Sequence, residues 1–298
     1  MTLKTKPSSL TVFEIGLAVL VAFLWAICFP FIELGHRAAT PLQFAALRAL
    51  IASMSLFIPM ICFNSKVFLK PSFWMASLWI GLTYTAMGLG GMFLADGRIS
   101  PGMATVLTNI QPFLAAVVAY FVLSEKLSKT VIVGLILGFV GVLVIALPNL
   151  ALGKNTDYII GVGYILLGAF GTAFGNVLMK KYANQYNPLI LTAGQLLLGS
   201  LILFLASFGI ERWQPINWNP SFIWSLLILA IPGTSLAVAI WIYLLKSVSV
   251  TRLNVFTFLT PAFGLSIGLV FFNETISLMD VLGIAVIFCG LYFIVRSD

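Results

Sequence analysis

Apolar stretches of about twenty residues alternate with short polar segments along the whole chain. A helix of that length crosses the ~30 Å hydrocarbon core of a bilayer, because each residue adds ~1.5 Å. The pattern therefore predicts an all-α membrane protein with ten transmembrane helices. Their approximate ranges are 12–32, 43–62, 73–94, 102–122, 130–147, 158–178, 189–208, 222–244, 252–272 and 279–295. The third range is the least regular, because Gly81, Gly88, Gly90 and Gly91 lower its helical propensity.

The composition supports a membrane protein. Hydrophobic residues make up 61% of the chain and charged residues 8%, and the mean hydropathy is +1.09. Soluble domains carry ~25% charged residues, so no soluble fold needs this much apolar surface.

Cationic residues are distributed unevenly between the two predicted membrane faces. One face carries four, which are Arg37, Arg98, Lys154 and Arg212. The other carries eleven, which are Lys4, Lys6, Lys66, Lys70, Lys126, Lys129, Lys180, Lys181, Lys246, Arg252 and Arg296. Lys and Arg near helix ends are retained in the cytoplasm, so we expect a multi-pass protein of the inner (plasma) membrane with both termini cytoplasmic. The net charge of +7 then requires no nucleic-acid partner.

The chain contains an internal repeat. Adding 149 to a residue number converts Pro112 into Pro261, and the same shift relates other pairs. These pairs are Glu125 and Glu274, Ser128 and Ser277, Gly134 and Gly283, and Gly141 and Gly290. Residues 1–150 and 151–298 thus form two repeats of five spans each. Because five is odd, the second repeat enters the membrane from the opposite face, and inverted repeats are typical of transporters with a midplane substrate site.

The segments LTNIQPFLAAVVAYFVLSEKLSKTVIVGLILGFVGVLVIA and LTPAFGLSIGLVFFNETISLMDVLGIAVIFCGLYFIV resemble the closing halves of two EamA repeats. This family belongs to the drug/metabolite transporter superfamily. The resemblance implies ten helices around a central cavity, walled mainly by spans one, three, four, six, eight and nine. It also implies efflux of amino acids or other small metabolites. One departure is that Gln195 stands where the first repeat has Arg48.

Catalytic and cofactor motifs are missing from the sequence. Cys28, Cys62 and Cys289 are isolated thiols without zinc-site spacing. His36, the single histidine, falls in the first loop opposite the termini with no ligand set beside it in sequence, so we expect a solvated loop residue. No nucleotide-binding motif occurs. We therefore expect no metal, no cofactor and no enzymatic activity.

Amides and aromatic side chains form the candidate substrate site. Trp25 and Phe29 are four residues apart on one predicted helix face, and Asn109 lies on the face that precedes Pro112. The repeat places Asn176 at the position that corresponds to Phe29, and Asn254 at the position that corresponds to Thr105, one turn before Asn109. The full set of candidate substrate-binding residues is Trp25, Phe29, Tyr84, Asn109, Asn176, Trp241 and Asn254. Amides pair with carboxylate and ammonium groups, and aromatic faces hold cations or apolar groups, so an amino acid, bulky or aromatic, fits this set.

Other polar residues have two interpretations. Buried Asn residues also join membrane helices, and Trp residues also anchor at interfaces. Arg48 lies inside a span, where a cation costs at least ~2.5 kcal/mol, so it pairs with Glu33 or carbonyls, or else reaches an anionic substrate group. The turn residues Glu125 and Glu274 suit turn closure, and Ser128 and Ser277 suit helix N-caps. Pro112 and Pro261 are expected to kink their helices.

Two other functions are considered. A carrier of phosphorylated metabolites or nucleotide sugars would need several cavity cations, and only Arg48 and the edge-placed Arg252 are available. An intramembrane lipid-modifying enzyme would need acid, base or nucleophile arrangements that the spans do not supply. We therefore predict a transporter of small amphipathic metabolites by alternating access. Its expected partners are the small-molecule substrate and the bilayer. The sequence does not determine the oligomeric state, and a monomer is compatible with two repeats that pack as one transport unit.

The topology is testable with single cysteines on a cysteine-free background. Cysteines that replace Lys154 and Lys181 should react with impermeant reagents from opposite membrane faces, because the single predicted span 158–178 lies between the two positions. Labelling is measured on intact cells and on inverted vesicles. Labelling of both positions from the same side would contradict the ten-span inverted arrangement.

Overall fold

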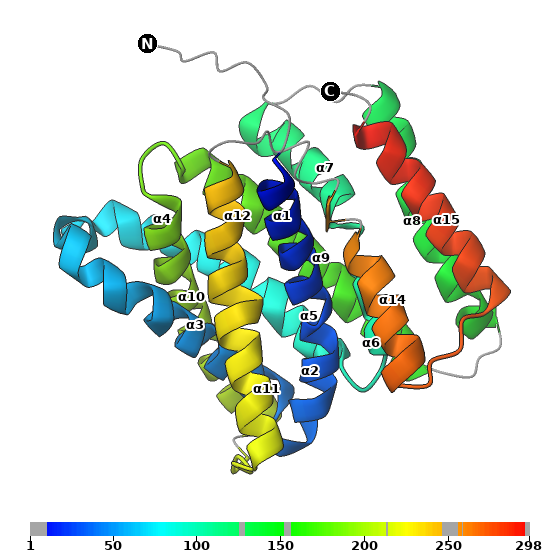
Figure 1. The fold of residues 1–298 in the computed structure, drawn as a ribbon, viewed down its shortest axis with the longest axis horizontal. Coiled ribbons are helices and arrows are strands. Elements are labelled where there is room, and N and C mark those ends of the chain that lie inside the picture. The colour runs from blue at the N-terminus through cyan, green and yellow to red at the C-terminus, as the bar shows by residue number, and fades with distance from the viewer. Residues whose placement is uncertain are drawn as a thin grey trace.

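The computed structural model describes residues 11–124, 129–151, 156–212, 214–245, 256–257 and 259–295. The described chain is a bundle of antiparallel helices (Figure 1). We call the side where α1 begins and α15 ends the terminal face, and the opposite side the distal face. The predicted all-helical fold is confirmed.

Each repeat contributes five spans, some of them divided into consecutive helices. The first repeat contains α1 (Val12–Ala26), α2 (Cys28–Gly35), η1 (His36–Ala38), α3 (Pro41–Asn64), η2 (Ser65–Leu69), α4 (Pro71–Ile80), η3 (Gly81–Leu89), α5 (Gly90–Ala95), α6 (Pro101–Thr108), α7 (Gln111–Leu123) and α8 (Lys129–Ala151). The second contains α9 (Thr156–Tyr182), α10 (Pro188–Ala206), η4 (Ser207–Glu211), α11 (Pro220–Ala230), η5 (Ile231–Leu236), α12 (Ala237–Leu245), α14 (Leu259–Phe271) and α15 (Leu278–Val295).

The spans agree with the hydropathy pattern. Within the described residues, seven helical segments are long and apolar enough to cross a membrane, and shorter apolar helices cover 132–145, 259–271 and 278–290. Together they account for the ten predicted spans.

Local sequence sets the helix starts. Proline begins α3, α4, α6, α10 and α11, where its missing N–H costs nothing. Thr11 and Glu14 form a capping box at α1. The Ser277 hydroxyl accepts a 3.2 Å hydrogen bond from the Asp280 amide, which confirms this residue as an N-cap. Ser128 lies outside the described residues.

Helix irregularities recur at related positions. The third span contains the π-helix η3 over 81–89, and the eighth contains η5 over 231–236, close to where a shift of 149 places it. The fourth span is interrupted at Asn109 and Ile110, just before Pro112, as the proline predicts. The first span is interrupted at Ile27. Irregular backbone thus concentrates inside the spans.

Helices α8 and α15 pack through reciprocal glycines. A Cβ atom added at Gly141 would lie 2.7 Å from the Gly283 carbonyl oxygen, and one added at Gly290 would lie 2.7 Å from that of Gly134. The repeat relates Gly134 to Gly283 and Gly141 to Gly290, so exchanging the two halves reproduces the same contacts. Such self-complementarity requires a two-fold relation between antiparallel helices. The predicted inverted repeats are confirmed.

Replacing Gly141 by Val should destabilise the protein, because the added carbons would overlap the α15 backbone. Overpacking of this kind costs ~1–3 kcal/mol. The matched control is Gly163→Val on α9, since a Cβ atom at Gly163 has nothing within 4 Å. Melting of the purified protein in detergent measures the difference. Equal melting temperatures for the two variants would contradict the close approach of α8 and α15.

Candidate functional site

Two tryptophans from different repeats pack against each other inside the bundle. Trp25 of α1 and Trp241 of α12 have ring centroids 5.2 Å apart with the planes inclined at 51°. Both side chains are half-buried beside Val21, Leu24 and Ala237. The structure therefore brings together two of the candidate residues that the sequence indicated separately.

Tyr84 and Asn176 lie where η3 meets α9, which is the repeat-related counterpart of the region where the first span meets the eighth. A Cβ atom at Gly175 would lie 2.5 Å from the Tyr84 Cβ atom, so the backbones of these elements touch beside Asn176. Asn176 is half-buried, and its amide has no hydrogen-bond partner within the described part of the chain. An amide without a partner among the described residues can hydrogen-bond a solute. The role of Asn176 in substrate binding stays a prediction.

Phe29 and Asn109 make contacts within the protein that stabilise the bundle. The chain turns at Ile27, and Phe29 packs in a different cluster from Trp25, with Leu107 and Ile165. Asn109 Nδ2 donates a 2.9 Å hydrogen bond to the Thr105 carbonyl oxygen, at the point where the fourth span is interrupted. This amide thus satisfies a backbone carbonyl group at the interruption of the helix. Asn254 lies outside the described residues.

Arg48 is a buried cation on α3. Its side chain donates from Nε to Thr234 Oγ1 at 3.1 Å and from an Nη atom to Cys28 Sγ at 3.3 Å. It also lies over the Phe93 ring, 5.9 Å from the centroid, and is 5% exposed. The expected pairing with Glu33 is wrong, because the Glu33 side chain is directed toward His36 at the distal end of the span. Among the described residues, no carboxylate forms an ion pair with Arg48.

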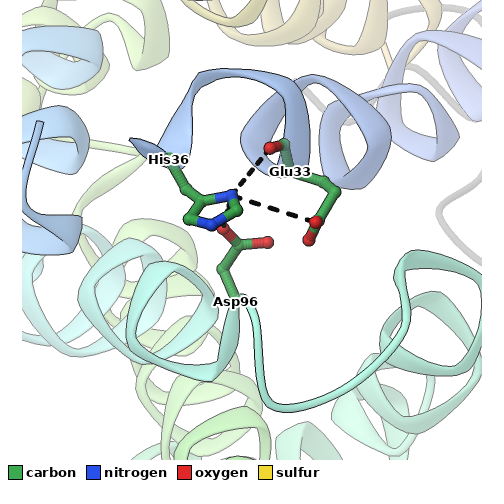
Figure 2. Close-up of polar contacts among 3 residues, drawn as sticks. All are labelled: Glu33, His36 and Asp96. Atoms are coloured by element: carbon green, nitrogen blue, oxygen red, sulfur yellow. Dashed lines mark hydrogen bonds and ion pairs between the residues drawn. The ribbon is translucent and has the colours of Figure 1, made fainter. Parts of the chain in front are cut away.

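The distal face carries a cluster of three ionisable side chains, which Figure 2 shows pointing toward one another. His36 Nδ1 lies 2.7 Å from the Glu33 carbonyl oxygen, 3.9 Å from Glu33 Oε1 and 3.4 Å from Asp96 Oδ2. The expectation of a solvated His36 without neighbouring ligands is therefore wrong. Asp96 is distant in sequence and reaches the cluster because α5 ends beside α2. The spacing of Glu33 and His36, three residues apart on a helical segment, was the signal available from the sequence.

Asp96 is an unusual carboxyl group. Its side chain is 7% exposed. Burial, and then the neighbouring Glu33 carboxylate, raise the pKa of Asp96 to about 8, against a smaller opposing effect of the Gly97 amide. Asp96 therefore holds a proton more tightly in the folded protein than in the unfolded chain.

Carboxylates of the second repeat close the distal face against the first repeat. Glu274 accepts hydrogen bonds from Ser100 Oγ and the Gly102 amide, both at 2.9 Å, at the start of α6. Glu211 accepts a 2.9 Å bond from the Leu42 amide at the start of α3. Glu274 was expected to close its own turn, and its side chain instead links that turn to the start of α6 in the other repeat. Glu125 lies outside the described residues. A cavity of about 280 Å³ lies beside this link and is lined by Glu33, Arg98, Ser100 and Glu274, among others.

Asp96→Asn should change how stability depends on pH. A pKa raised from 3.8 to about 8 means that the wild type loses stability as the pH rises through this interval, because ionisation disfavours the folded state. Asparagine has no proton to lose, so the variant should gain melting temperature relative to the wild type over the same interval. Melting curves in the presence of a chelator measure this gain. A constant difference at all pH values would contradict the raised pKa.

The architecture and sequence match known transporters. The sequence pattern of the EamA-like transporter family matches residues 12–147 and 159–296. An uncharacterized transporter of Archaeoglobus fulgidus is 27% identical over 95% of this chain and 98% of its own. A Salmonella typhimurium protein named probable amino-acid metabolite efflux pump is 30% identical, over 93% of this chain and 92% of its own.

A solved crystal structure has the same fold, with a TM-score of 0.64 and 18% identity over 94% of this chain and 96% of that one. The family match covers both repeats, in agreement with the reciprocal contacts between them. It also excludes the lipid-modifying enzyme, because the family consists of transporters. The chain belongs to the EamA-like transporter family.

Proposed function

We propose that this transporter exports amino acids, bulky or aromatic ones in particular, by alternating access. The observation that carries the proposal is the contact between Trp25 and Trp241, which joins the two repeats inside the membrane. An aromatic pair at such a junction offers faces for the ammonium group or the side chain of an amino acid. The name of the Salmonella typhimurium relative supports this substrate class.

Arg48 supports a substrate that carries a carboxylate. A guanidinium group inside the membrane needs an anionic partner or several acceptors, and the described residues supply a hydroxyl, a thiol and a ring face. A solute carboxylate would complete its neutralisation. Phosphorylated metabolites carry more negative charge and would need further cations. Among the described residues, Arg48 is the one cation in the interior of a span, which favours amino acids over these solutes.

The interrupted spans support the motion. The breaks at Ile27 and Asn109 and the π-helices η3 and η5 lie inside four of the spans that the family resemblance assigns to the cavity wall. Helices bend most readily at such positions. We propose that the two repeats rock against each other at these points, with the links of Glu211 and Glu274 broken when the distal face opens. We also propose that the protein lies in the inner membrane with its terminal face in the cytoplasm. The proposed functional unit is a monomer.

Trp25→Ala and Trp241→Ala should each weaken substrate binding about tenfold, which corresponds to ~1.4 kcal/mol for a desolvated aromatic contact. Counterflow in proteoliposomes, with aromatic amino acids, sugar phosphates and nucleotide sugars as test solutes, measures this effect. Trp224→Ala is the matched control, because Trp224 is 65% exposed on α11 and would face lipid.

An outcome that would contradict the proposal is counterflow of phosphorylated solutes but not of amino acids. Equal affinity in the wild type and both pair variants would remove the tryptophans from the site. Loss of monodisperse protein in both pair variants, but not in Trp224→Ala, would assign the pair to helix packing and also contradict its binding role.

A further inference from the structure

Three side chains of metal-binding type converge at the distal face. Glu33 of α2 and His36 of η1 are three residues apart, so they lie on one side of the same helical segment. Asp96 follows the last residue of α5 and faces both of them (Figure 2). One potential ligand atom from each residue lies within 4.8 Å of the other two. Two separate spans thus contribute to one cluster.

The distances are close to those of a zinc site. Zinc binds imidazole nitrogen and carboxylate oxygen at ~2.0–2.2 Å in a tetrahedron, which places neighbouring ligand atoms ~3.3 Å apart. His36 Nδ1 and Asp96 Oδ2 are separated by 3.4 Å, which already matches. Nδ1 and Glu33 Oε1 are 3.9 Å apart, and a small rotation of the Glu33 side chain, 29% exposed, would close the difference.

Asp96 provides a second observation, which is a buried and unpartnered oxygen atom within the cluster. Its Oδ2 atom is buried and accepts no hydrogen bond within the described part of the chain, although the side chain is 7% exposed. A buried carboxylate oxygen without a donor is costly unless a cation or proton neutralises it. His36 does not satisfy this oxygen as a hydrogen-bond donor, because its Nδ1 atom lies closer to the Glu33 carbonyl oxygen, at 2.7 Å.

The cluster is accessible from solution at its Glu33 edge. The cavity of about 280 Å³ borders Glu33 and continues to Ser100 and Glu274, so water can reach the cluster and complete a fourth coordination position. Metal binding requires that His36 exchange its hydrogen bond with the Glu33 carbonyl for the metal. This exchange is a rotation of the His36 side chain, which is 29% exposed.

We propose that Glu33, His36 and Asp96 bind a divalent transition-metal ion, with Zn²⁺ as the fitting species. The ion joins α2 and η1 to the end of α5 at the distal face. A site with an imidazole and two carboxylates suits zinc better than calcium or magnesium, which take oxygen ligands alone. This proposal does not depend on the identity of the transported solute.

Isothermal titration with zinc chloride tests the site on the full-length protein in detergent. The protein is purified without a histidine tag and carries Cys289→Ser, because Cys289 is an exposed thiol. We expect one zinc ion per chain and a rise in melting temperature with zinc. Glu33→Gln, His36→Gln and Asp96→Asn should each weaken binding by more than the ~10–100-fold that is usual for a second-shell change.

The matched control is Asp157→Asn, an acidic residue near the same face whose side chain is 75% exposed and outside the cluster. It should bind zinc as the wild type does. Three separate ligand variants keep the test valid if one of them fails to fold. Absence of binding at millimolar zinc, or unchanged affinity in the folded ligand variants, would overturn the proposal and leave the cluster as an ion pair.

Discussion

The bundle depends on the close approach of helix backbones in a solvent that does not drive them together. Lipid tails are as apolar as the side chains, so membrane helices associate through packing and hydrogen bonds and favour small residues at their contacts. Here glycines provide that contact. A Cβ atom at Gly91 would lie 2.8 Å from the Gly168 nitrogen, and one at Gly81 would lie 2.6 Å from the Gln195 carbonyl oxygen. The glycines that weaken the third span as a helix therefore attach it to α9 and α10.

Close packing coexists with irregular backbone because side chains satisfy the displaced carbonyls. Thr83 Oγ1 donates to the Trp79 carbonyl at 2.9 Å in the third span, and Thr234 Oγ1 donates to that of Leu229 at 2.8 Å in the eighth. Asn109 does the same in the fourth span. Unsatisfied backbone groups would be costly in hydrocarbon, so these polar residues permit irregular geometry at membrane depth. Thr234 also accepts from Arg48, which connects the irregular segment to the buried cation.

Most of the fold could be predicted from the sequence because its signals are local or periodic. Hydropathy locates the spans, and a constant shift of 149 residues, as between Pro112 and Pro261, establishes the repeat. The odd number of spans in each repeat then predicts the inversion. The arrangement of the candidate site could be predicted less well from the sequence. Phe29 leaves the neighbourhood of Trp25 because the helix is interrupted at Ile27, three residues before Pro30, and regular helical spacing does not hold across this break. The partners of His36 and Arg48 come from other spans, and pairings of that kind are fixed by packing in three dimensions.

The reciprocal glycine contacts between α8 and α15 bear on the ancestry of the chain. A surface that is complementary to its own inverted copy is the surface that two identical five-helix chains would use if they inserted in opposite directions. Every such glycine would then have served two equivalent contacts, and a single substitution would have disturbed both. Fusion into one chain assigns one contact to each copy. The fused gene can thus diversify one half at a time. The related contacts of Cys28 with Gly233 and of Tyr84 with Gly175, each between the two halves, accordingly join different residues.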